Sequence, residues 1–197
     1  MQDYDLILAS ASPRRTEILH QIGVRHQIIP ADIDETPRSG EMATDYVQRM
    51  ALEKAQHVML LSKDSTPVLG ADTCVVCDGT IFGKPSQRDE AMDMLSALSG
   101  KSHWVHTAVA VAYQGDFALQ ISSTEVVFRK LSKQECLIYW ETGEPIDKAG
   151  SYAIQGYGSV FVESIAGSYS GVVGLPIKET YLLLKKFGVP IWHARGN

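Results

Sequence analysis

The sequence predicts a fold that mixes strands and helices, and three patterns carry that prediction. A short apolar run at 5–9 passes directly into a segment rich in serine, proline and arginine, which is typical of a strand, a loop and a helix start. Apolar residues recur with helical spacing along 44–61. Two long segments, 103–113 and 117–128, flank a glycine-containing turn, so we expect them to form an antiparallel hairpin.

The remaining elements follow from start and stop signals. Asp78-Gly79 supplies the positive φ angles of a tight turn and predicts a hairpin between 68–77 and 80–82. Ser86 and Asp89 have the spacing of a capping box for a helix that ends at Gly100. Further strands are expected at 26–30 and 160–165, and further helices at 13–22, 132–141 and 175–187.

Length and composition restrict the classes of protein. The 197 residues suffice for one domain or for two small lobes, and 45% hydrophobic and 21% charged residues are ordinary for a globular protein. No segment reaches the ~18 consecutive apolar residues that indicate a membrane span. The net charge of −5 gives no electrostatic footprint for a nucleic-acid polymer. A small phosphorylated ligand needs only a local cluster of cations.

The cysteines and the N-terminal residues indicate the compartment. Cys74, Cys77 and Cys136 make an odd count, which argues against a disulfide framework. Cys74 and Cys77 are three apart on a predicted strand and so point to opposite faces, and we interpret them as packing residues. The first residues lack the basic start and long apolar centre of an export signal. We therefore expect a cytoplasmic protein without a membrane partner.

Asp72 is the most unusual residue of the strand predicted at 68–77. An unpaired carboxylate is costly to desolvate, so a strand of this kind must supply a compensating group. The predicted hairpin returns Lys84 towards Asp72, and the pair could activate water with a metal and hold a phosphate. An Asp–Lys pair that only staples the hairpin explains the pattern equally well. For the catalytic interpretation, we expect Asp72 to face solvent-filled space and to be flanked by positive side chains from distant parts of the chain. An Asp72 that is both buried and remote from those cations would rule it out.

The helix predicted from residue 13 begins with a cluster suited to an anion. Ser10, Ser12, Arg14 and Arg15 gather where free backbone N–H groups and the positive end of the helix dipole lie. Basic residues in a first turn oppose the dipole, which favours a bound phosphate. The alternative is a capped helix with solvated arginines.

Two further charged positions suggest the same site. Lys54 falls on the apolar stripe of the 44–61 helix, so it should either reach water or end beside a carboxylate or a ligand phosphate. Asp34 or Glu35, in the acidic loop before that helix, could face the same cleft as Asp72, although a solvated loop is an open alternative. The D-x-D-x-T pattern at Asp32 lacks the later acidic pair of haloacid-dehalogenase phosphatases, and we reject that assignment.

The polar loop at 142–156 is too long and too specific for an ordinary turn. A loop of this kind can wrap a ligand, and the amide of Gln155 can both donate to and accept from the edge of a heterocyclic base. His103 and His106 stand on opposite faces of one predicted strand, so a shared metal is disfavoured.

Taken together, these segments resemble the Maf family of nucleoside triphosphate pyrophosphatases over nearly the whole chain. The residues that carry the resemblance are Ser10-Ala11-Ser12-Pro13-Arg14-Arg15, Asp34-Glu35, Lys54-Ala55, Gly70-Ala71-Asp72-Thr73, Gly83-Lys84-Pro85, Leu98-Ser99-Gly100, Thr142-Gly143-Glu144-Pro145, Asp147-Lys148-Ala149-Gly150, Ile154-Gln155-Gly156 and Val173-Gly174-Leu175-Pro176. We accordingly expect residues 1–197 to form a single Maf-like domain.

The resemblance implies a fold and a reaction. The fold is a mixed α/β (α+β) structure of two lobes, with an elongated mixed sheet flanked by helices and a central cleft, similar to inosine triphosphate pyrophosphatases. The reaction is hydrolysis of a nucleoside triphosphate between its α and β phosphates, with a divalent cation, Mg²⁺ or Mn²⁺. Ser-Pro-Arg-Arg, Thr73 and Gln155 resemble the branch acting on dTTP and UTP. In a house-cleaning role, the physiological substrate is either a normal pyrimidine nucleotide or a modified one that must be kept out of nucleic acid. A homodimer is also implied.

The family's residue roles transfer by position. Asp72 resembles the proton acceptor that activates water, and together with Glu35 it would hold the metal. Specificity would come from Arg14, Thr73 and Gln155, and the other substrate contacts would be Ser10, Ser12, Arg15, Lys54 and Lys84. The alternative is a nucleotide-binding regulator of cell division without turnover. Asp72 argues against it, because a pure binder gains nothing from another carboxylate beside a triphosphate.

Overall fold

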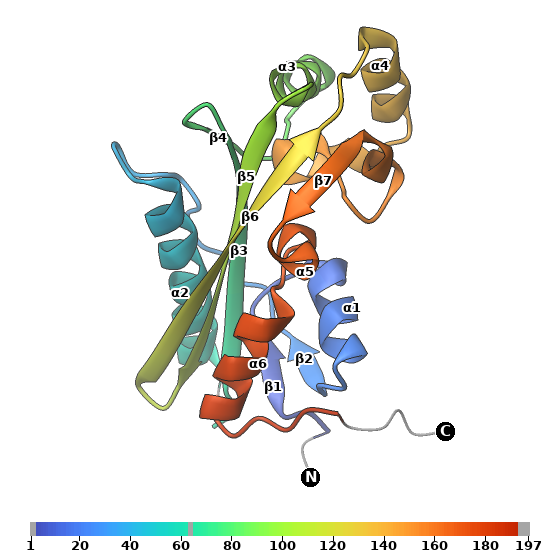
Figure 1. Ribbon diagram of the computed structural model, residues 1–197. Coiled ribbons are helices and arrows are strands. Elements are labelled where there is room, and N and C mark those ends of the chain that lie inside the picture. Colours follow the sequence, from blue (N-terminus) through green and yellow to red (C-terminus); the bar gives the residue numbers. More distant parts are fainter. Residues whose placement is uncertain (1–2, 63–64, 193–197) are drawn as a thin grey trace. The chain divides into compact units, whose positions relative to one another are not determined.

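The computed structural model describes residues 3–62 and 65–192. Its strands are β1 (Leu6–Leu8), β2 (His26–Ile28), β3 (Val68–Cys77), β4 (Thr80–Phe82), β5 (Ser102–Tyr113), β6 (Asp116–Phe128) and β7 (Val162–Ala166). Its α-helices are α1 (Pro13–Gln21), α2 (Ala43–Leu61), α3 (Arg88–Leu98), α4 (Lys133–Glu141), α5 (Tyr169–Val173) and α6 (Ile177–Lys186), all drawn in Figure 1. Short 3₁₀ turns span Glu144–Asp147, Ala149–Ser151 and Tyr157–Phe161.

The described strands form one seven-stranded mixed sheet, as the sequence led us to expect. The strand order is β2-β1-β3-β5-β6-β7, and β4 pairs with β3 outside this path. Strand β1 runs parallel to both β2 and β3, whereas the pairs β3–β4 and β6–β7 are antiparallel. Asp78 and Gly79 have φ angles of 49° and 76°, which confirms the predicted turn between β3 and β4.

The chain divides into two compact units. The first unit comprises Met1–Asp72, Thr107–Ser122 and Gly174–Asn197, and the second comprises Thr73–His106 and Ser123–Val173. Strands β3, β5 and β6 contribute residues to both units. Within the part of the chain that the structure describes, no helix is both long enough and apolar enough to cross a membrane.

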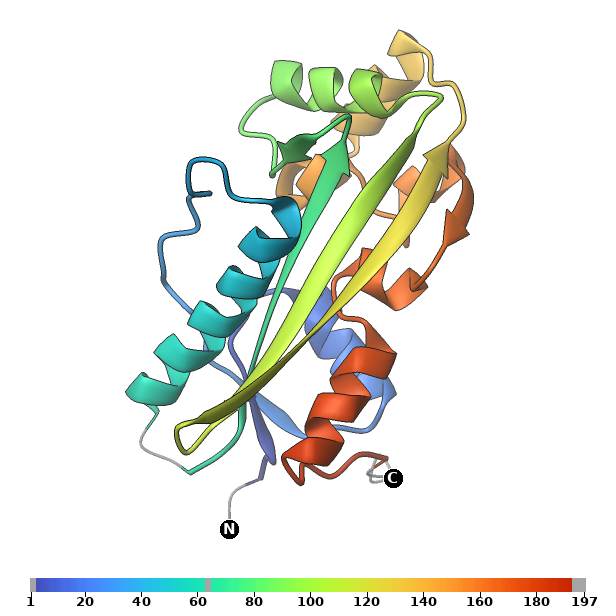
Figure 2. The same ribbon diagram turned by 60° about the vertical axis from the view of Figure 1, so that its left-hand side comes forward.

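The first unit covers its strands with helices on both faces. Helix α2 lies on one face, and α1 and α6 lie on the other (Figures 1 and 2). Strand β1 is fully buried, which explains its unbroken apolar sequence Leu6-Ile7-Leu8. The first strand thus needs no polar alternation, because neither of its faces meets water.

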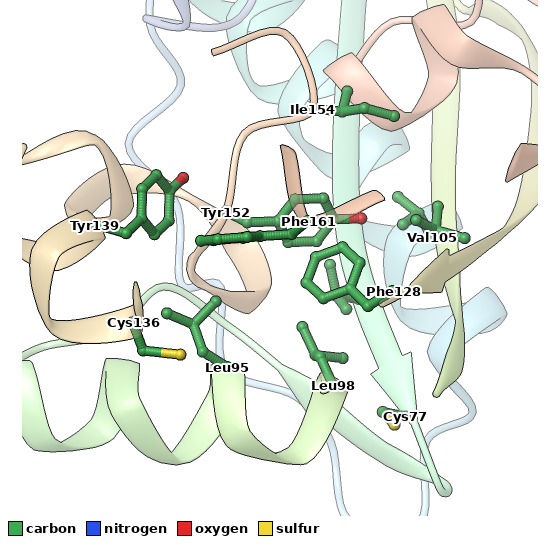
Figure 3. Close-up of a cluster of buried hydrophobic side chains, with 12 residues drawn as sticks. Cys77, Leu95, Leu98, Val105, Phe128, Cys136, Tyr139, Tyr152, Ile154 and Phe161 are labelled. Atoms are coloured by element: carbon green, nitrogen blue, oxygen red, sulfur yellow. The ribbon is translucent and has the colours of Figure 1, made fainter. Parts of the chain in front are cut away.

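The second unit is built around a cluster of aromatic side chains (Figure 3). The rings of Phe128 and Tyr152 lie 4.7 Å apart and those of Tyr139 and Phe161 lie 4.9 Å apart, both in edge-on geometry. His103, 1% exposed, joins this cluster edge-on to Phe128. The cysteines Cys74, Cys77 and Cys136 are free and buried, so the interpretation as packing residues is confirmed.

One predicted helix start is wrong. Helix α3 begins at Arg88 with Gln87 as its N-cap, and Ser86 does not cap it. The backbone N–H and the hydroxyl of Ser86 both donate to Glu90 Oε2 at 2.7 Å. The capping-box spacing was present in the sequence, but Glu90 competes for Ser86 from one residue further along. By contrast, Ser132 and Glu135 form a capping box at the start of α4, which lies within the helix predicted at 132–141.

Candidate active site

The carboxylate of Asp72 lies beside the ammonium of Lys54. Asp72 stands in the part of β3 that belongs to the first unit, and Lys54 reaches it from α2, with 2.7 Å between Nζ and Oδ1. The two side chains are only 9% and 8% exposed. The prediction that Lys54 ends beside a carboxylate is confirmed. The prediction that Asp72 faces open space is wrong, because α2 and its lysine pack against this face of the strand.

Gly70 explains how α2 comes so close to β3. A Cβ atom on Gly70 would lie 2.2 Å from the Ala51 carbonyl oxygen and 2.7 Å from the Ala55 backbone nitrogen. Glycine is therefore required for this helix and strand to touch. Residues two apart on a strand share a face, so Gly70 and Asp72 both point at α2. The contact at Gly70 brings Lys54 within hydrogen-bond distance of Asp72.

Lys54 also binds a second carboxylate, that of Glu35. Their Nζ and Oε1 atoms are 3.0 Å apart, and the Glu35 side chain is 49% exposed. The Tyr46 hydroxyl, on α2, donates to the Glu35 carbonyl oxygen at 3.0 Å and fixes the loop to the helix. One ammonium thus joins a buried and a half-exposed carboxylate, both in the first unit.

The neighbouring Asp34 does not join this group. Its Oδ1 accepts hydrogen bonds from the backbone N–H and the hydroxyl of Thr36, at 2.9 and 2.6 Å. These two bonds lower the pKa of Asp34 below its usual value. Of the two loop carboxylates considered from the sequence, Glu35 is the one that the structure places beside Lys54.

Arg15 ties the start of α1 to two other segments of the first unit. Its Nε donates to the Gly174 carbonyl at 2.9 Å, and its Nη1 donates to the Ser10 hydroxyl at 2.9 Å. The backbone N–H of Ser12 donates to the same Ser10 oxygen at 3.2 Å. Ser10 therefore accepts bonds from two residues, and three of the four predicted residues, Ser10, Ser12 and Arg15, form one cluster.

The beginning of α1 has the character of an anion site. Pro13 is the first helical residue, as predicted, and Ser12 is the N-cap, although its hydroxyl makes no capping bond to the described helix. The first turn carries no acidic residue, and it bears Arg14 and Arg15, both half-buried. Positive side chains at the positive end of a helix dipole are favourable only when a negative charge is close. Asp72 and Glu35 supply part of that charge to Arg15.

Burial and neighbouring charges shift the pKa of Asp72 in opposite directions, and the same is true of Arg15. Burial raises the pKa of Asp72 above its usual value, although the charge and hydrogen bond of Lys54 oppose that rise. Burial likewise lowers the pKa of Arg15, and the negative charge of Asp72 opposes the decrease. A carboxylate with a raised pKa is a better proton acceptor than an exposed one.

The donor set suits a hard divalent cation. Glu35 and Asp72 offer carboxylate oxygens, the preferred ligands of Mg²⁺, and both reach the same Lys54 nitrogen. Among the described residues, no group of three or more histidine, cysteine, aspartate or glutamate side chains could hold a metal. A cation here would complete its shell with water and phosphate oxygens, as Mg²⁺ commonly does.

The other three predicted contacts belong to the second unit. Thr73 is half-buried in β3, Lys84 is exposed just after β4, and Gln155 is exposed between buried Ile154 and the backbone of Gly156. Within this unit, the hairpin pairs Val75 with Phe82, two residues before Lys84. The roles of these three residues in binding stay predictions.

Sequence reasoning missed two elements of the site. It paired Asp72 with Lys84 through the hairpin, whereas the hydrogen-bond partner in the structure is Lys54, 18 residues earlier. It also gave no role to the Gly174 carbonyl that holds Arg15. The signal for the first was present, because Lys54 is a lysine on an apolar helix face. The second could not be seen, since a backbone carbonyl leaves no trace in a sequence.

Comparisons with known proteins identify the family of this chain. Residues 5–187 match the model of the Maf family, described as Maf-like protein. The chain is 48% identical to a dTTP/UTP pyrophosphatase of Saccharophagus degradans, over 95% of this chain and 91% of that protein. It is 51% identical to a dTTP/UTP pyrophosphatase of Methylobacillus flagellatus, over 94% of each chain. A third, from Hahella chejuensis, is 50% identical over 95% of this chain and 94% of its own length.

Solved structures give more distant similarities. The Ham1 protein of Staphylococcus aureus aligns with a TM-score of 0.42 and 11% identity over 62% of this chain and 71% of its own. A nucleoside-triphosphatase, dITP/XTP pyrophosphatase, of Mycobacterium abscessus aligns with a TM-score of 0.38 and 14% identity over 62% and 72%. The match to the family model and the identities of about 50% over nearly the whole chain decide the assignment, and this chain belongs to the Maf family.

Proposed function

We propose that this protein hydrolyses UTP and dTTP between the α and β phosphates and releases a nucleoside monophosphate and pyrophosphate. Relatives of about 50% identity carry the name dTTP/UTP pyrophosphatase. The structural observation that supports the proposal most is the Lys54 ammonium, which joins Asp72 and Glu35 in the first unit. The buried pair of Lys54 and Asp72 is costly to maintain for stability alone.

Asp72 is the proposed proton acceptor. A general base works best when its pKa lies near the working pH, and burial raises the pKa of Asp72 in that direction. In the Asp72 carboxylate, Oδ1 is the atom that accepts from Lys54. We propose that the carboxylate removes a proton from the water that attacks the α phosphate. Transfer of that proton generates the nucleophile, and pyrophosphate leaves.

The proposed phosphate ligands are hydroxyl-bearing and positive side chains of the first unit. Ser10, Ser12, Arg14, Arg15 and Lys54 supply hydroxyls, guanidinium groups and an ammonium. The positive charges of Lys54 and Arg15 already favour the ionised form of Asp72. A triphosphate would share these cations with the carboxylates. Fixed charges of this kind stabilise the negative charge that develops on phosphate oxygens in the transition state.

Glu35 and Asp72 are the proposed metal ligands, with Mg²⁺ or Mn²⁺ as the ion. A divalent cation bound there would lower the pKa of water and neutralise phosphate charge. The half-exposed position of Glu35 leaves its carboxylate free to move from Lys54 to a cation.

The second unit would supply the remaining contacts. We propose Lys84 as a further phosphate ligand, and Thr73 and Gln155, with Arg14, as the residues that select the nucleotide. These roles rest on the resemblance of the sequence segments, and on the exposure of Lys84 and Gln155. A homodimer in the cytoplasm that removes unwanted pyrimidine nucleotides is the proposed physiological setting.

The direct test is a panel of triphosphates assayed for product identity. We expect the protein to convert UTP and dTTP to UMP and dTMP plus pyrophosphate with Mg²⁺ or Mn²⁺, and to stop when EDTA is added. CTP, GTP and ATP serve as comparison substrates. Release of orthophosphate instead of pyrophosphate would contradict the proposal. Tight binding of UTP without any product would favour the regulator that binds nucleotide without turnover.

A further inference from the structure

Glu144, which the proposed site does not use, accepts three hydrogen bonds in the second unit. Oε1 accepts from the Tyr139 hydroxyl at 2.7 Å and from the Gly158 backbone N–H at 2.9 Å. Oε2 accepts from the Tyr157 backbone N–H at 2.8 Å. Gly143, with a φ of 76°, makes the turn from which Glu144 points. One half-buried carboxylate therefore holds the backbone just after Gln155.

Glycine at position 156 is needed for this contact. A Cβ atom there would lie 2.0 Å from Glu144 Oε2, and one at Gly158 would lie 2.7 Å from the Tyr139 hydroxyl. The glutamate and the tyrosine therefore pack directly on the backbone of this segment. The contact links two sequence segments that have no common role in the proposed reaction, Thr142-Gly143-Glu144-Pro145 and Ile154-Gln155-Gly156.

Tyr139 fixes the other side of Gln155. Its hydroxyl accepts from the Ala153 backbone N–H at 3.1 Å while it donates to Glu144. Burial and the bond to Glu144 raise the pKa of Tyr139, so the hydroxyl keeps its proton and stays a donor. Residues 153 and 157–158 are thus held by one hydrogen-bonded pair, and the exposed side chain of Gln155 stands between them.

Only a carboxylate satisfies the three donors. A hydroxyl proton and two backbone N–H groups converge on Glu144, and an ionised carboxylate is an acceptor at both oxygens. A glutamine of the same shape would turn an NH₂ group towards at least one donor. The position therefore requires an acidic residue because of its two acceptor oxygens, since glutamine has the same size but offers only one.

We propose that Glu144 is a positioning residue that fixes the backbone on either side of Gln155, so that the Gln155 amide meets the nucleobase in one orientation. The inference rests on the proposed function for the role of Gln155. A side chain carried by a rigid backbone loses less conformational freedom when a ligand binds, and it discriminates ligands more sharply. Glu144 acts through Gln155 and the segment that carries it, and it does not itself touch the nucleotide.

The variant Glu144→Gln tests this role, and Glu141→Gln, at an exposed glutamate three residues earlier, is the matched control. We expect Glu144→Gln to weaken UMP binding about tenfold, the factor that corresponds to one hydrogen bond to a charged group. Its inhibition constant for inorganic pyrophosphate should stay within about twofold of wild type, because the proposed phosphate ligands of the first unit are unchanged. Glu141→Gln should alter neither.

Hydrogen exchange gives a readout that does not depend on the reaction. The amides of Tyr157 and Gly158 should exchange faster in Glu144→Gln than in wild type, whereas the amides of β6 should not. Tyr139→Phe, which removes the shared hydroxyl but leaves the two backbone bonds to Glu144, should weaken UMP binding about threefold. It keeps the test available should Glu144→Gln fold poorly.

Three outcomes would overturn the inference. They are unchanged UMP binding in both variants, an equal loss of pyrophosphate and UMP binding, and a wild-type protein that binds no UMP. Failure of the proposed function has a separate signature, since wild-type protein would then release no pyrophosphate from UTP. In that case UMP binding and its dependence on Glu144 would still decide the role of this residue.

Discussion

The two units of this protein bury polar groups in opposite ways. In the first unit, Lys54 and Asp72 are both less than 10% exposed in their side chains, and both carry charge. In the second, the buried polar pair is His103 and Tyr152, whose Nε2 and hydroxyl are 2.9 Å apart and which are neutral at pH 7. The second pair fits within an aromatic cluster at low electrostatic cost, whereas the first requires compensation by charge.

This difference suggests different roles for the buried polar groups of the two units. The first unit keeps charges where an apolar pair is often as stable or more so, which is expected if these charges serve the proposed phosphate site. The second unit uses its polar groups to join segments, as in the pair His103–Tyr152 and in Glu144 on Tyr157. The comparison yields the following predictions, from the largest expected effect on stability to the smallest.

Breaking the buried ion pair should have the largest effect. Lys54→Met leaves Asp72 without its hydrogen-bonded partner, and we expect a loss of about 3–5 kcal/mol in the free energy of unfolding at pH 7. Urea unfolding measures the change. The double variant Lys54→Met with Asp72→Leu removes both charges and should recover most of that loss. A single variant as stable as wild type would show that the pair contributes nothing.

His103 should make stability depend on pH between 7 and 4. Burial lowers its pKa to about 4, from about 6.5 in the unfolded chain. Between pH 6.5 and 4 the unfolded chain is protonated at this histidine and the folded chain is not. The contribution of neutral His103 to the free energy of unfolding is therefore full above pH 6.5 and is lost as the pH falls to 4. The loss amounts to about 3 kcal/mol.

The variant His103→Gln isolates this effect, because glutamine can still bond Tyr152 but does not titrate. Chemical denaturation at half-unit steps of pH should give a shallower decrease for the variant than for wild type. Glu41 and Glu135, whose pKa values are lowered to about 2, contribute equally to both proteins at lower pH. Parallel curves would contradict a neutral, buried His103.

Adding one methyl group at Gly70 should have a smaller effect on stability than on activity. The new Cβ of Gly70→Ala meets backbone atoms of α2, so the helix must shift, at a cost of about 1–3 kcal/mol. The shift moves Lys54 relative to Asp72, and turnover should fall about a hundredfold. Gly83→Ala, where an added Cβ would meet no atom within 4 Å and the backbone is not in the left-handed region, is the control for stability. Normal turnover in Gly70→Ala would show that the spacing of α2 and β3 is not critical.

Local patterns predicted most of the elements. The hairpins around Asp78-Gly79 and between β5 and β6, the long helix α2 and the capped helix α4 depend on residues close in sequence, and the structure reproduces them within a few residues. The start of α3 was wrong because two acidic residues, Asp89 and Glu90, compete for the same serine. Propensity does not decide such a competition.

The sequence singled out Lys54 and Asp72 as candidate site residues, but it did not predict that they contact each other. Lys54 on an apolar face and Asp72 in a buried strand each signalled an unsatisfied charge, yet their contact depends on how closely α2 packs on β3 at Gly70. The hydrogen bonds of Glu144 beside Gln155 could not be predicted for the same reason, since they are made to backbone N–H groups, which almost every residue has. Tertiary contacts with backbone atoms are what the sequence could not supply.

The central claim is that Asp72 takes a proton from water, and a single substitution tests it most directly. Asp72→Asn should bind UTP as wild type does, while its rate of pyrophosphate release with Mg²⁺ falls about a thousandfold. Asp78→Asn, at the exposed turn that follows the same strand, should retain full turnover. An Asp72→Asn protein that releases pyrophosphate at a rate close to wild type would contradict the account.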